Sequence, residues 1–269
     1  MKLNEKYLAV IGAGNIGQIL LERLRNAKVP ADHLVVCDND KNRVEAASER
    51  FGVRSVILAD EAVCAADAIL IAVSPKSVID IIKTFAEWVC PCRLVISFAA
   101  GVPLAKIEEI LQPGTPVARI MPNAPSLIGK GINPVAYGAN VTPEARELVE
   151  AILGILGESL VARDDQMNWC VGMIGAAMRS VLPILEGMTR AGIEAGFSEA
   201  DSRKMAAQVM LGTATLALKE DLTFNQMKAL TPMETLDEEA LSQLFFKAAQ
   251  TAQEKISGLQ QKICSGLNN

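Results

Sequence analysis

A glycine-rich stretch directly follows the first apolar run of the chain. Tyr7–Ile11 has the composition of a buried strand, and the glycines after it open a stretch of helical periodicity. The first glycine of such a motif permits a tight turn, the second lets a pyrophosphate approach the backbone, and the third allows a helix to pack closely on the strand. Free N–H groups at the start of the helix attract the phosphates. The predicted dinucleotide-binding residues are Gly12, Gly14, Asn15, Ile16 and Gly17.

An acidic residue follows the second predicted strand at the spacing that dinucleotide-binding folds require. Asp38 comes directly after Leu34–Cys37, about 20 residues beyond Gly17. A carboxylate at this place can hold both ribose hydroxyls of NAD and repels a 2′-phosphate. Lys41 and Arg43 follow, and they can attract that phosphate or simply form the solvated start of a helix. NAD or NADP therefore fits as the cofactor, and we expect NAD to be favoured.

The elements that must position this turn alternate between strand and helix along the first half of the chain. Repeated units of this kind build a parallel sheet covered by helices on both faces. The predicted strands are Leu8–Ile11, Leu34–Cys37, Ala68–Val73, Leu94–Ser97, Val117–Met121, Val135–Tyr137 and Ser159–Ala162. We therefore predict an α/β fold, with a doubly wound Rossmann-type parallel sheet domain over residues 1–162 and an all-α domain over residues 163–269.

The second half of the chain has helical periodicity and no convincing strand. Apolar residues from Met167 to Met188 recur at alternating steps of four and three, which predicts one long helix, kinked at Pro183. Ser198–Lys219 and Leu236–Ile263 are the next predicted helices. Their broad apolar faces must be covered by the first domain, by each other or by a second subunit. We therefore expect a homodimer through this half, and a higher oligomer is also open.

Composition excludes several classes of function. Half of the 269 residues are hydrophobic, and 26 Lys plus Arg against 31 Asp plus Glu give a net charge of −5 without a dominant basic stretch, so we expect no nucleic-acid partner. We expect no membrane helix, because no run reaches the roughly 18 apolar residues that one needs. The polar N-terminus indicates a cytoplasmic location. A single histidine, His33, argues against a hydrolase triad. Six cysteines without metal-ligand spacing are expected to be reduced, mostly buried and free of metal.

Three further segments, together with the glycine turn, resemble the pyrroline-5-carboxylate reductase family. They stand where the family shows A-V-K-P, S-x-x-A-G and R-x-M-P-N-T-P, and they read Ala72-Val73-Ser74-Pro75, Ser97-Phe98-Ala99-Ala100-Gly101 and Arg119-Ile120-Met121-Pro122-Asn123-Ala124-Pro125. The resemblance implies that the nicotinamide side of the cleft is lined by Val73, Ser74, Pro75, Ala100 and Gly101. It implies a substrate-side position for Met121, Pro122 and Asn123. The Asn123 amide would point toward nicotinamide or substrate, although such an amide can equally cap a turn.

The helical half resembles the dimerisation domain of this family, in which two subunits interleave their helices and complete each other's substrate pocket. Two pocket segments depart from the family pattern. The family's S-G-S-G-P turn is replaced by a segment that includes Gly175-Ala176-Ala177, and Thr231-Pro232-Met233-Glu234-Thr235-Leu236 stands in place of S-P-G-G-T-T. The predicted substrate contacts in the first segment are Ala176, Arg179 and Ser180, and Arg179 can grip a carboxylate with two hydrogen bonds.

The second departure has a direct physical consequence. Glycines let backbone amides close on an anion, whereas Met233 adds bulk and Glu234 adds a charge that repels a carboxylate. We therefore expect weak turnover of pyrroline-5-carboxylate. Thr235 can replace one of the family's threonines. Glu234 can pair with a cationic substrate, donate a proton, or cap the following helix in a box with Thr231. The predicted catalytic residues are Asn123, Thr235 and Glu234.

The sequence as a whole predicts an NAD(P)H-dependent oxidoreductase that transfers hydride to the C=N bond of a small cyclic imine. Two alternatives stay open. One is a catalytically weak dinucleotide-binding dimer, a redox sensor or pseudoenzyme, which the departures in the pocket favour. The other is a β-hydroxyacid-type dehydrogenase, a class that carries a catalytic lysine on its linking helix. Residues 165–190 contain no lysine, which argues against it.

Overall fold

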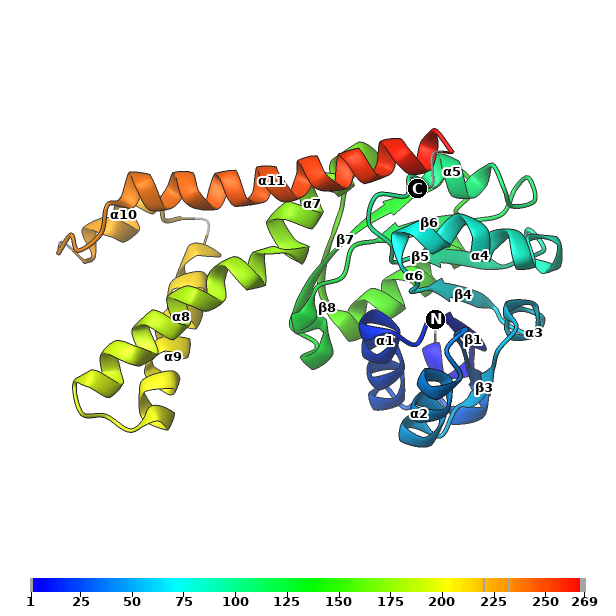
Figure 1. The fold of residues 1–269 in the computed structure, drawn as a ribbon, viewed down its shortest axis with the longest axis horizontal. Helices are drawn as coiled ribbons and strands as arrows, with labels where there is room; N and C mark the ends of the chain where they lie inside the picture. Colours follow the sequence, from blue (N-terminus) through cyan, green and yellow to red (C-terminus); the bar gives the residue numbers. More distant parts are fainter. Residues whose placement is uncertain (1, 220, 232, 267–269) are drawn as a thin grey trace. The chain divides into compact units, whose positions relative to one another are not determined.

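The computed structural model describes residues 2–219, 221–231 and 233–266 of the chain. They form two compact units (Figure 1). One unit consists of the residues up to Gly175 together with those from Gln250 onward, and the other is Ala176–Ala249. The division into residues 1–162 and 163–269 stays a prediction.

The first unit is built on an eight-stranded sheet. The strand order is β3-β2-β1-β4-β5-β6-β7-β8, and neighbouring strands run parallel except β6 and β7. The strands are β1 Leu8–Ile11, β2 Leu34–Cys37, β3 Arg54–Val56, β4 Ala68–Ile71, β5 Leu94–Ser97, β6 Val117–Ile120, β7 Gly131–Tyr137 and β8 Gly157–Val161. This order, with β1 at the switch between the two directions of winding, confirms the doubly wound Rossmann-type fold.

Helices cover both faces of this sheet, because successive side chains of a strand point to opposite faces. Leu8 and Val10 of β1 belong to the core cluster under α1, α2 and α6, whereas Ala9 and Ile11 belong to the cluster under α3, α4 and α5. The helices of this unit are α1 Asn15–Asn26, α2 Lys41–Phe51, α3 Ala59–Val63, α4 Val78–Phe85, α5 Leu104–Glu108, α6 Pro143–Leu156 and α7 Met167–Cys170. Short 3-10 turns lie at Leu3–Glu5, Ala31–His33, Pro75–Ser77, Ala86–Trp88, Ala124–Ile128 and Asp164–Gln166.

The sheet differs from the predicted one in two strands. β7 is antiparallel to β6, because the segment 121–130 that joins them is too short for the crossover that a parallel pair needs. β3 was missed because Arg54-Ser55-Val56 is a short edge strand with an exposed arginine, which gives almost no apolar pattern.

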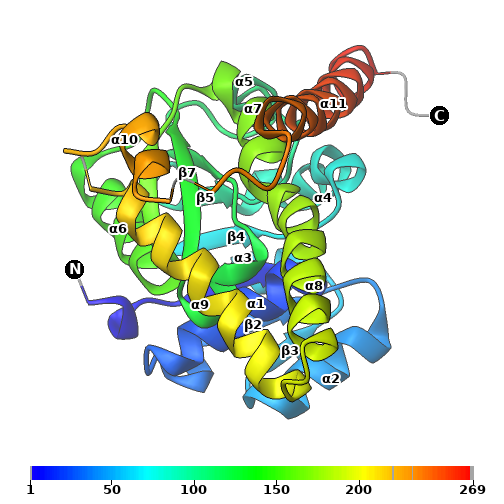
Figure 2. The ribbon, with the colours of Figure 1, turned by 90° about the vertical axis from the view of Figure 1, so that its left-hand side faces the viewer.

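The helical half contains α8 Ala177–Glu194, α9 Glu199–Ala217, α10 Phe224–Ala229 and α11 Glu238–Cys264. α8 and α9 lie side by side (Figure 2), and α9 begins at the predicted cap, because Ser198 Oγ accepts the Asp201 N–H at 3.1 Å. The long helix predicted from Met167 lies within one helical stretch, Asp164–Glu194, but a π-helical turn at Val171–Gly175 divides it into α7 and α8. The two glycines of this stretch, Gly172 and Gly175, have low helix propensity and weaken the regular α-helix there.

Two features of the structure bear on the expectations from composition. The helical stretch Asp164–Glu194 is, by length and composition alone, long and apolar enough to cross a membrane; one such helix is weak evidence for a membrane protein. Cys90 and Cys92 form a disulfide, because the turn in which the Arg93 N–H donates to the Cys90 carbonyl brings the two side chains together. The four free cysteines are also less buried than expected, since Cys37 is buried, Cys170 is half-buried, and Cys64 and Cys264 are exposed.

Candidate active site

The glycine turn at the end of β1 is fixed by backbone contacts that leave no room for side chains. The Gly12 N–H donates to the Cys37 carbonyl at 2.7 Å, and Gly12 has φ +107°, where a Cβ atom would lie 2.7 Å from the Ala72 carbonyl carbon. A Cβ atom at Gly17 would lie 1.8 Å from the Gly12 carbonyl oxygen. Gly12 therefore lets the turn pass close to the backbone that follows β4, and Gly17 lets α1 pack closely on the turn.

Gly14 has the opposite surroundings, although it belongs to the same turn. It precedes α1 in extended conformation, with φ −72° and ψ −168°, and a Cβ atom there would meet no protein atom within 4 Å. The first N–H groups of a helix have no acceptor within the helix, and in α1 they belong to Asn15, Ile16 and Gly17. The turn thus presents donors and free space where a phosphate would approach, so its residues fit a dinucleotide.

Asp38 is tied to the same turn by its carboxylate. Oδ2 accepts the Ala13 N–H at 2.7 Å, and Oδ1 accepts the Asp40 N–H at 2.9 Å. Each oxygen keeps a second lone pair, so the binding of ribose hydroxyls stays a prediction. The two nearby cations already have partners, since Arg43 pairs with Asp40 at 3.3 Å and Lys41 with Glu45 at 3.7 Å.

The predicted nicotinamide segments follow the carboxyl ends of β4 and β5. They lie on the same side of the sheet as the glycine turn, because β1, β4 and β5 are parallel neighbours. Val73 and Pro75 are half-buried, and the exposed Ser74 shares a hydrogen bond with the Ser77 hydroxyl at 2.9 Å. Ala100 is half-buried beside Gly101, which has φ +70° and faces α11: a Cβ atom at Gly101 would lie 3.4 Å from Cγ2 of Ile256. The C-terminal part of α11 therefore packs against this edge.

A buried arginine on β6 links that edge to the helices. Arg119 is fully buried, and its Nη1 donates to Oδ1 of Asp164 at 2.8 Å. The other carboxylate oxygen of Asp164 accepts the Leu104 N–H at 3.0 Å, which fixes the start of α5. Asn168 lies 3.5 Å from Nη2 of Arg119 and donates to Gln260 of α11 at 2.7 Å. These partners were not predicted, although a charged residue inside a buried strand indicates that a partner must exist.

Asn123 uses its side-chain carbonyl within the fold. Oδ1 accepts the Ile132 N–H at 3.2 Å and lies 3.5 Å from Oγ of Ser126, so the amide supports the start of β7. The Asn123 side chain makes no capping hydrogen bond to the turn Ala124–Ile128, and its role toward nicotinamide or substrate stays a prediction. Met121 and Pro122, which precede Asn123, are buried.

The remaining predicted residues belong to the helical unit. Ala176 precedes α8 and is half-buried, and Arg179 is exposed on α8. Ser180 lines a hollow of about 360 Å³ between α8 and α11. Thr235 lines a hollow of about 710 Å³ beside it, and Glu234 is exposed on the same loop. The two hollows share Leu241 and Phe245, so this unit brings Ser180 and Thr235 to adjoining surfaces. Pro232 lies outside the described residues.

The capping interpretation of Glu234 is wrong. α11 begins at Glu238, later than the predicted Leu236, and Oδ1 of Asp237 accepts the Ala240 N–H at 2.9 Å at its start. Glu234 therefore precedes the helix by too many residues to belong to its capping box.

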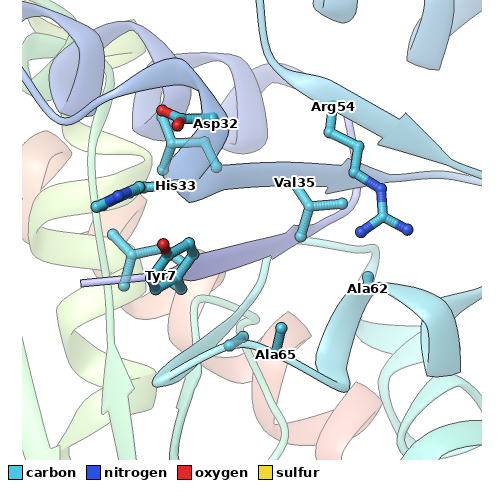
Figure 3. Close-up of a pocket in the computed structure, with 10 residues that line it drawn as sticks. Tyr7, Asp32, His33, Val35, Arg54, Ala62 and Ala65 are labelled. Carbon is cyan, nitrogen blue, oxygen red and sulfur yellow. The ribbon is translucent and has the colours of Figure 1, made fainter. Parts of the chain in front are cut away.

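A small hollow lies at the other ends of the strands, away from the glycine turn (Figure 3). It lies at the amino ends of β1 and β2, where Tyr7 and His33 stack with ring centroids 4.1 Å apart. Ligands of doubly wound sheets bind at the carboxyl ends of the strands. Among the described residues, no group of three or more His, Cys, Asp or Glu side chains could hold a metal ion.

The fold and the glycine turn define a class, the NAD(P)-dependent oxidoreductases with a Rossmann-type domain and a helical second half. Residues 7–101 match the family model described as NADP oxidoreductase coenzyme F420-dependent, and residues 164–259 match pyrroline-5-carboxylate reductase dimerisation. The chain is 31% identical to the pyrroline-5-carboxylate reductases of Mycobacterium tuberculosis (79% of this chain and 74% of the relative covered) and of Escherichia coli K12 (80% and 80%). The chain belongs to the pyrroline-5-carboxylate reductase family.

Solved structures confirm the fold. The pyrroline carboxylate reductase of Plasmodium falciparum with NADP bound superposes with a TM-score of 0.84 at 20% identity, covering 96% of this chain and 99% of that one. The pyrroline-5-carboxylate reductase of Coxiella burnetii gives a TM-score of 0.80 at 22% identity, with 94% and 98% covered. The family predicted from the sequence motifs and the predicted fold class are thus both confirmed.

Proposed function

We propose that the chain reduces the C=N bond of a small cyclic imine with hydride from NAD(P)H. The observation that carries this proposal is the turn at Gly12, Gly14 and Gly17, in which two glycines are required by packing and the third leaves space for a pyrophosphate. Membership of the pyrroline-5-carboxylate reductase family supplies the reaction class.

The residues of the chain would contribute binding and orientation. The nicotinamide supplies the hydride when it is bound, so the protein needs to hold the reacting atoms in place and exclude water. The first turn of α1 would hold the pyrophosphate. Val73 and Ala100, at the carboxyl ends of β4 and β5, would lie beside the nicotinamide ring. The buried Arg119–Asp164 pair would hold α5 and the C-terminal part of α11 beside the carboxyl ends of these strands.

The experiment that tests this proposal is steady-state oxidation of NADH and NADPH with pyrroline-5-carboxylate and a panel of other cyclic imines. Turnover of at least one imine at a kcat/KM of about 10⁴ M⁻¹s⁻¹, the lower end of the usual enzyme range, is expected. Tight cofactor binding without turnover of any imine would instead favour the pseudoenzyme alternative. Turnover of a β-hydroxyacid would favour the dehydrogenase alternative.

We propose NAD as the preferred cofactor. The Asp38 carboxylate at the end of β2 disfavours a 2′-phosphate, and the cations that could compensate, Lys41 and Arg43, pair with carboxylates of their own segment. Calorimetric titration should give a lower Kd for NADH than for NADPH, and Asp38→Ser should narrow the difference. A lower Kd for NADPH in the wild-type chain would refute this preference.

A homodimer through the helical half completes the proposal. Large apolar side chains of α8, α9 and α11 are exposed, among them Leu182, Val209 and Leu244, and residues 164–259 match a dimerisation domain. A second copy would cover these side chains and the apolar stretch Asp164–Glu194. Burial of that stretch in a dimer is compatible with the proposed cytoplasmic location.

A further inference from the structure

The disulfide Cys90–Cys92 contributes little to holding the fold together. A disulfide stabilises a protein mainly by restricting its unfolded chain, and this restriction is smallest when the bridged residues are close in sequence, here two positions apart. The turn that carries the bridge is also held without it. The Arg93 N–H donates to the Cys90 carbonyl at 3.0 Å, and the buried side chains of Val89 and Leu94 anchor the chain on either side. We therefore expect the dithiol form to fold as the disulfide form does.

The two bridged cysteines differ in their access to solvent. Cys92 is exposed, whereas Cys90 is half-buried. Thiol–disulfide exchange begins when a thiolate attacks one sulfur of the disulfide and displaces the other, and access decides which sulfur is attacked. An incoming thiol therefore reaches Cys92, and Cys90 is the sulfur that leaves.

The residue after the disulfide is a cation whose hydrogen bonds leave its charge uncompensated. The Arg93 guanidinium donates to the backbone carbonyls of Val63, Cys64 and Trp88, all of which are neutral acceptors. Because Trp88 lies two residues before Cys90, this cation is close to the segment that leads into the disulfide. A cation near a cysteine favours the thiolate, which is both the nucleophile and the leaving group of thiol–disulfide exchange.

Cys92 also lines a hollow of about 240 Å³ at the amino ends of β1, β4, β5 and β6, beside the start of α6. The charged side chains that line it are Lys6, Asp67 and Glu144. The Lys6 ammonium lies 3.8 Å from the Asp67 carboxylate, so these two charges offset each other. The exposed carboxylate of Glu144 therefore gives the hollow a net negative charge, which attracts an ammonium group.

We propose that Cys90 and Cys92 form a thiol–disulfide exchange site that accepts low-molecular-weight thiols carrying an ammonium group. A thiolate attacks Sγ of Cys92, a new S–S bond forms there, and Cys90 leaves as a thiolate. A second thiolate attacks the outer sulfur of this mixed disulfide and releases Cys92. Two small thiols are thus oxidised to their disulfide, the protein disulfide is reduced, and the two thiol protons end on Cys90 and Cys92. In the proposed cytoplasmic location, a disulfide is usually catalytic or redox-sensing.

The first test is a redox titration of the full-length protein in buffers of reduced and oxidised glutathione, followed by alkylation and mass spectrometry. The Cys90–Cys92 pair should pass from disulfide to dithiol as the proportion of reduced glutathione rises. Reduction should lower the urea-unfolding midpoint by no more than about 1 M. Cys64→Ser, at an exposed free cysteine, should leave the titration unchanged. A disulfide that persists at every ratio, or a larger loss of stability on reduction, would overturn the proposal.

The second test separates the attacked sulfur from the leaving sulfur. Cys90→Ser keeps the exposed thiol of Cys92, and Cys92→Ser keeps the half-buried thiol of Cys90. With oxidised glutathione, the mixed disulfide should form at least about tenfold faster at Cys92 than at Cys90, as located by peptide mapping. Equal rates, or a faster reaction at Cys90, would refute the assignment of Cys92 as the attacked residue.

The third test concerns the ammonium group of the thiol. Cysteine and N-acetylcysteine differ in that group, and each is compared between wild type and variant, so that its intrinsic reactivity cancels. Glu144→Gln should slow reduction of the disulfide by cysteine about threefold, the size expected for an exposed charge pair, and should not slow reduction by N-acetylcysteine. Glu49→Gln, an exposed carboxylate of α2 outside the hollow, should change neither rate. Equal effects of Glu144→Gln on the two thiols would refute the preference for an ammonium group.

Discussion

Replacement of Gly14 should separate cofactor binding from folding. Gly14 is extended, with φ −72°, and a Cβ atom there meets no protein atom within 4 Å, so Gly14→Val needs no rearrangement of the fold. Its free energy of unfolding should stay within about 0.5 kcal/mol of the wild type. The added side chain occupies the path of the pyrophosphate to the backbone. NADH binding should therefore weaken at least about a hundredfold, which corresponds to about 2.8 kcal/mol.

Two matched glycines make this test specific. Gly17→Ala places a Cβ atom 1.8 Å from the Gly12 carbonyl oxygen, so it should lower the free energy of unfolding by about 1–3 kcal/mol or more, as overpacking does. Gly154→Val, on an open face of α6, should change neither folding nor binding appreciably. Calorimetry with NADH and urea unfolding measure the two quantities. Wild-type affinity in Gly14→Val would refute the assignment of the cofactor site.

Three other perturbations have expected outcomes. Asp164→Asn leaves the buried Arg119 without its counter-charge and should cost about 3–5 kcal/mol in urea unfolding, whereas Asp165→Asn, in an exposed ion pair, should cost less than about 1 kcal/mol; equal costs would contradict this. Val209→Asp, on an exposed apolar face of α9, should convert a dimer into a monomer in light scattering; a wild-type protein that is monomeric at micromolar concentration would refute the dimer. Burial raises the pKa of the Cys37 thiol to about 12, so the folded state favours the neutral thiol. The contribution of this thiol to the free energy of unfolding is fully present below pH 9 and is lost as pH rises toward 12. Cys37→Ala should therefore reduce the loss of stability at alkaline pH. An unchanged dependence of stability on pH would contradict the raised pKa of Cys37.

The parts of the fold that were predicted correctly depend on local sequence. A strand, a glycine turn and a helix follow one another within Tyr7–Asn26, and the constraint at Gly17 comes from the Gly12 backbone of the same turn. The apolar strands and the cap at Ser198 are equally local signals. β3 and the antiparallel direction of β7 were not predicted, because short edge strands and strand direction depend on contacts that periodicity does not encode.

The site residues show the same division. The types of Asp38 and Asn123 suggested ligand contacts, but their side chains hold the N–H groups of Ala13 and Ile132. These pairings depend on how the loops fold, which the spacing of residue types does not encode. The departure at Met233 and Glu234 was visible in the sequence. The ion pair between Lys228 and Glu238 was not visible in the sequence, because it depends on how α10 lies near the start of α11.

Transfer of deuterium from the cofactor tests the central claim most directly. NADH deuterated at C4, prepared with the label on each face in turn, is incubated with the protein and the cyclic imine panel, and the amine products are analysed by mass spectrometry. Transfer of hydride from nicotinamide to the imine carbon predicts one deuterium at that carbon for one of the two labelled faces. Protein that binds NADH but places no deuterium in any amine would contradict the assignment of this chain as an imine reductase.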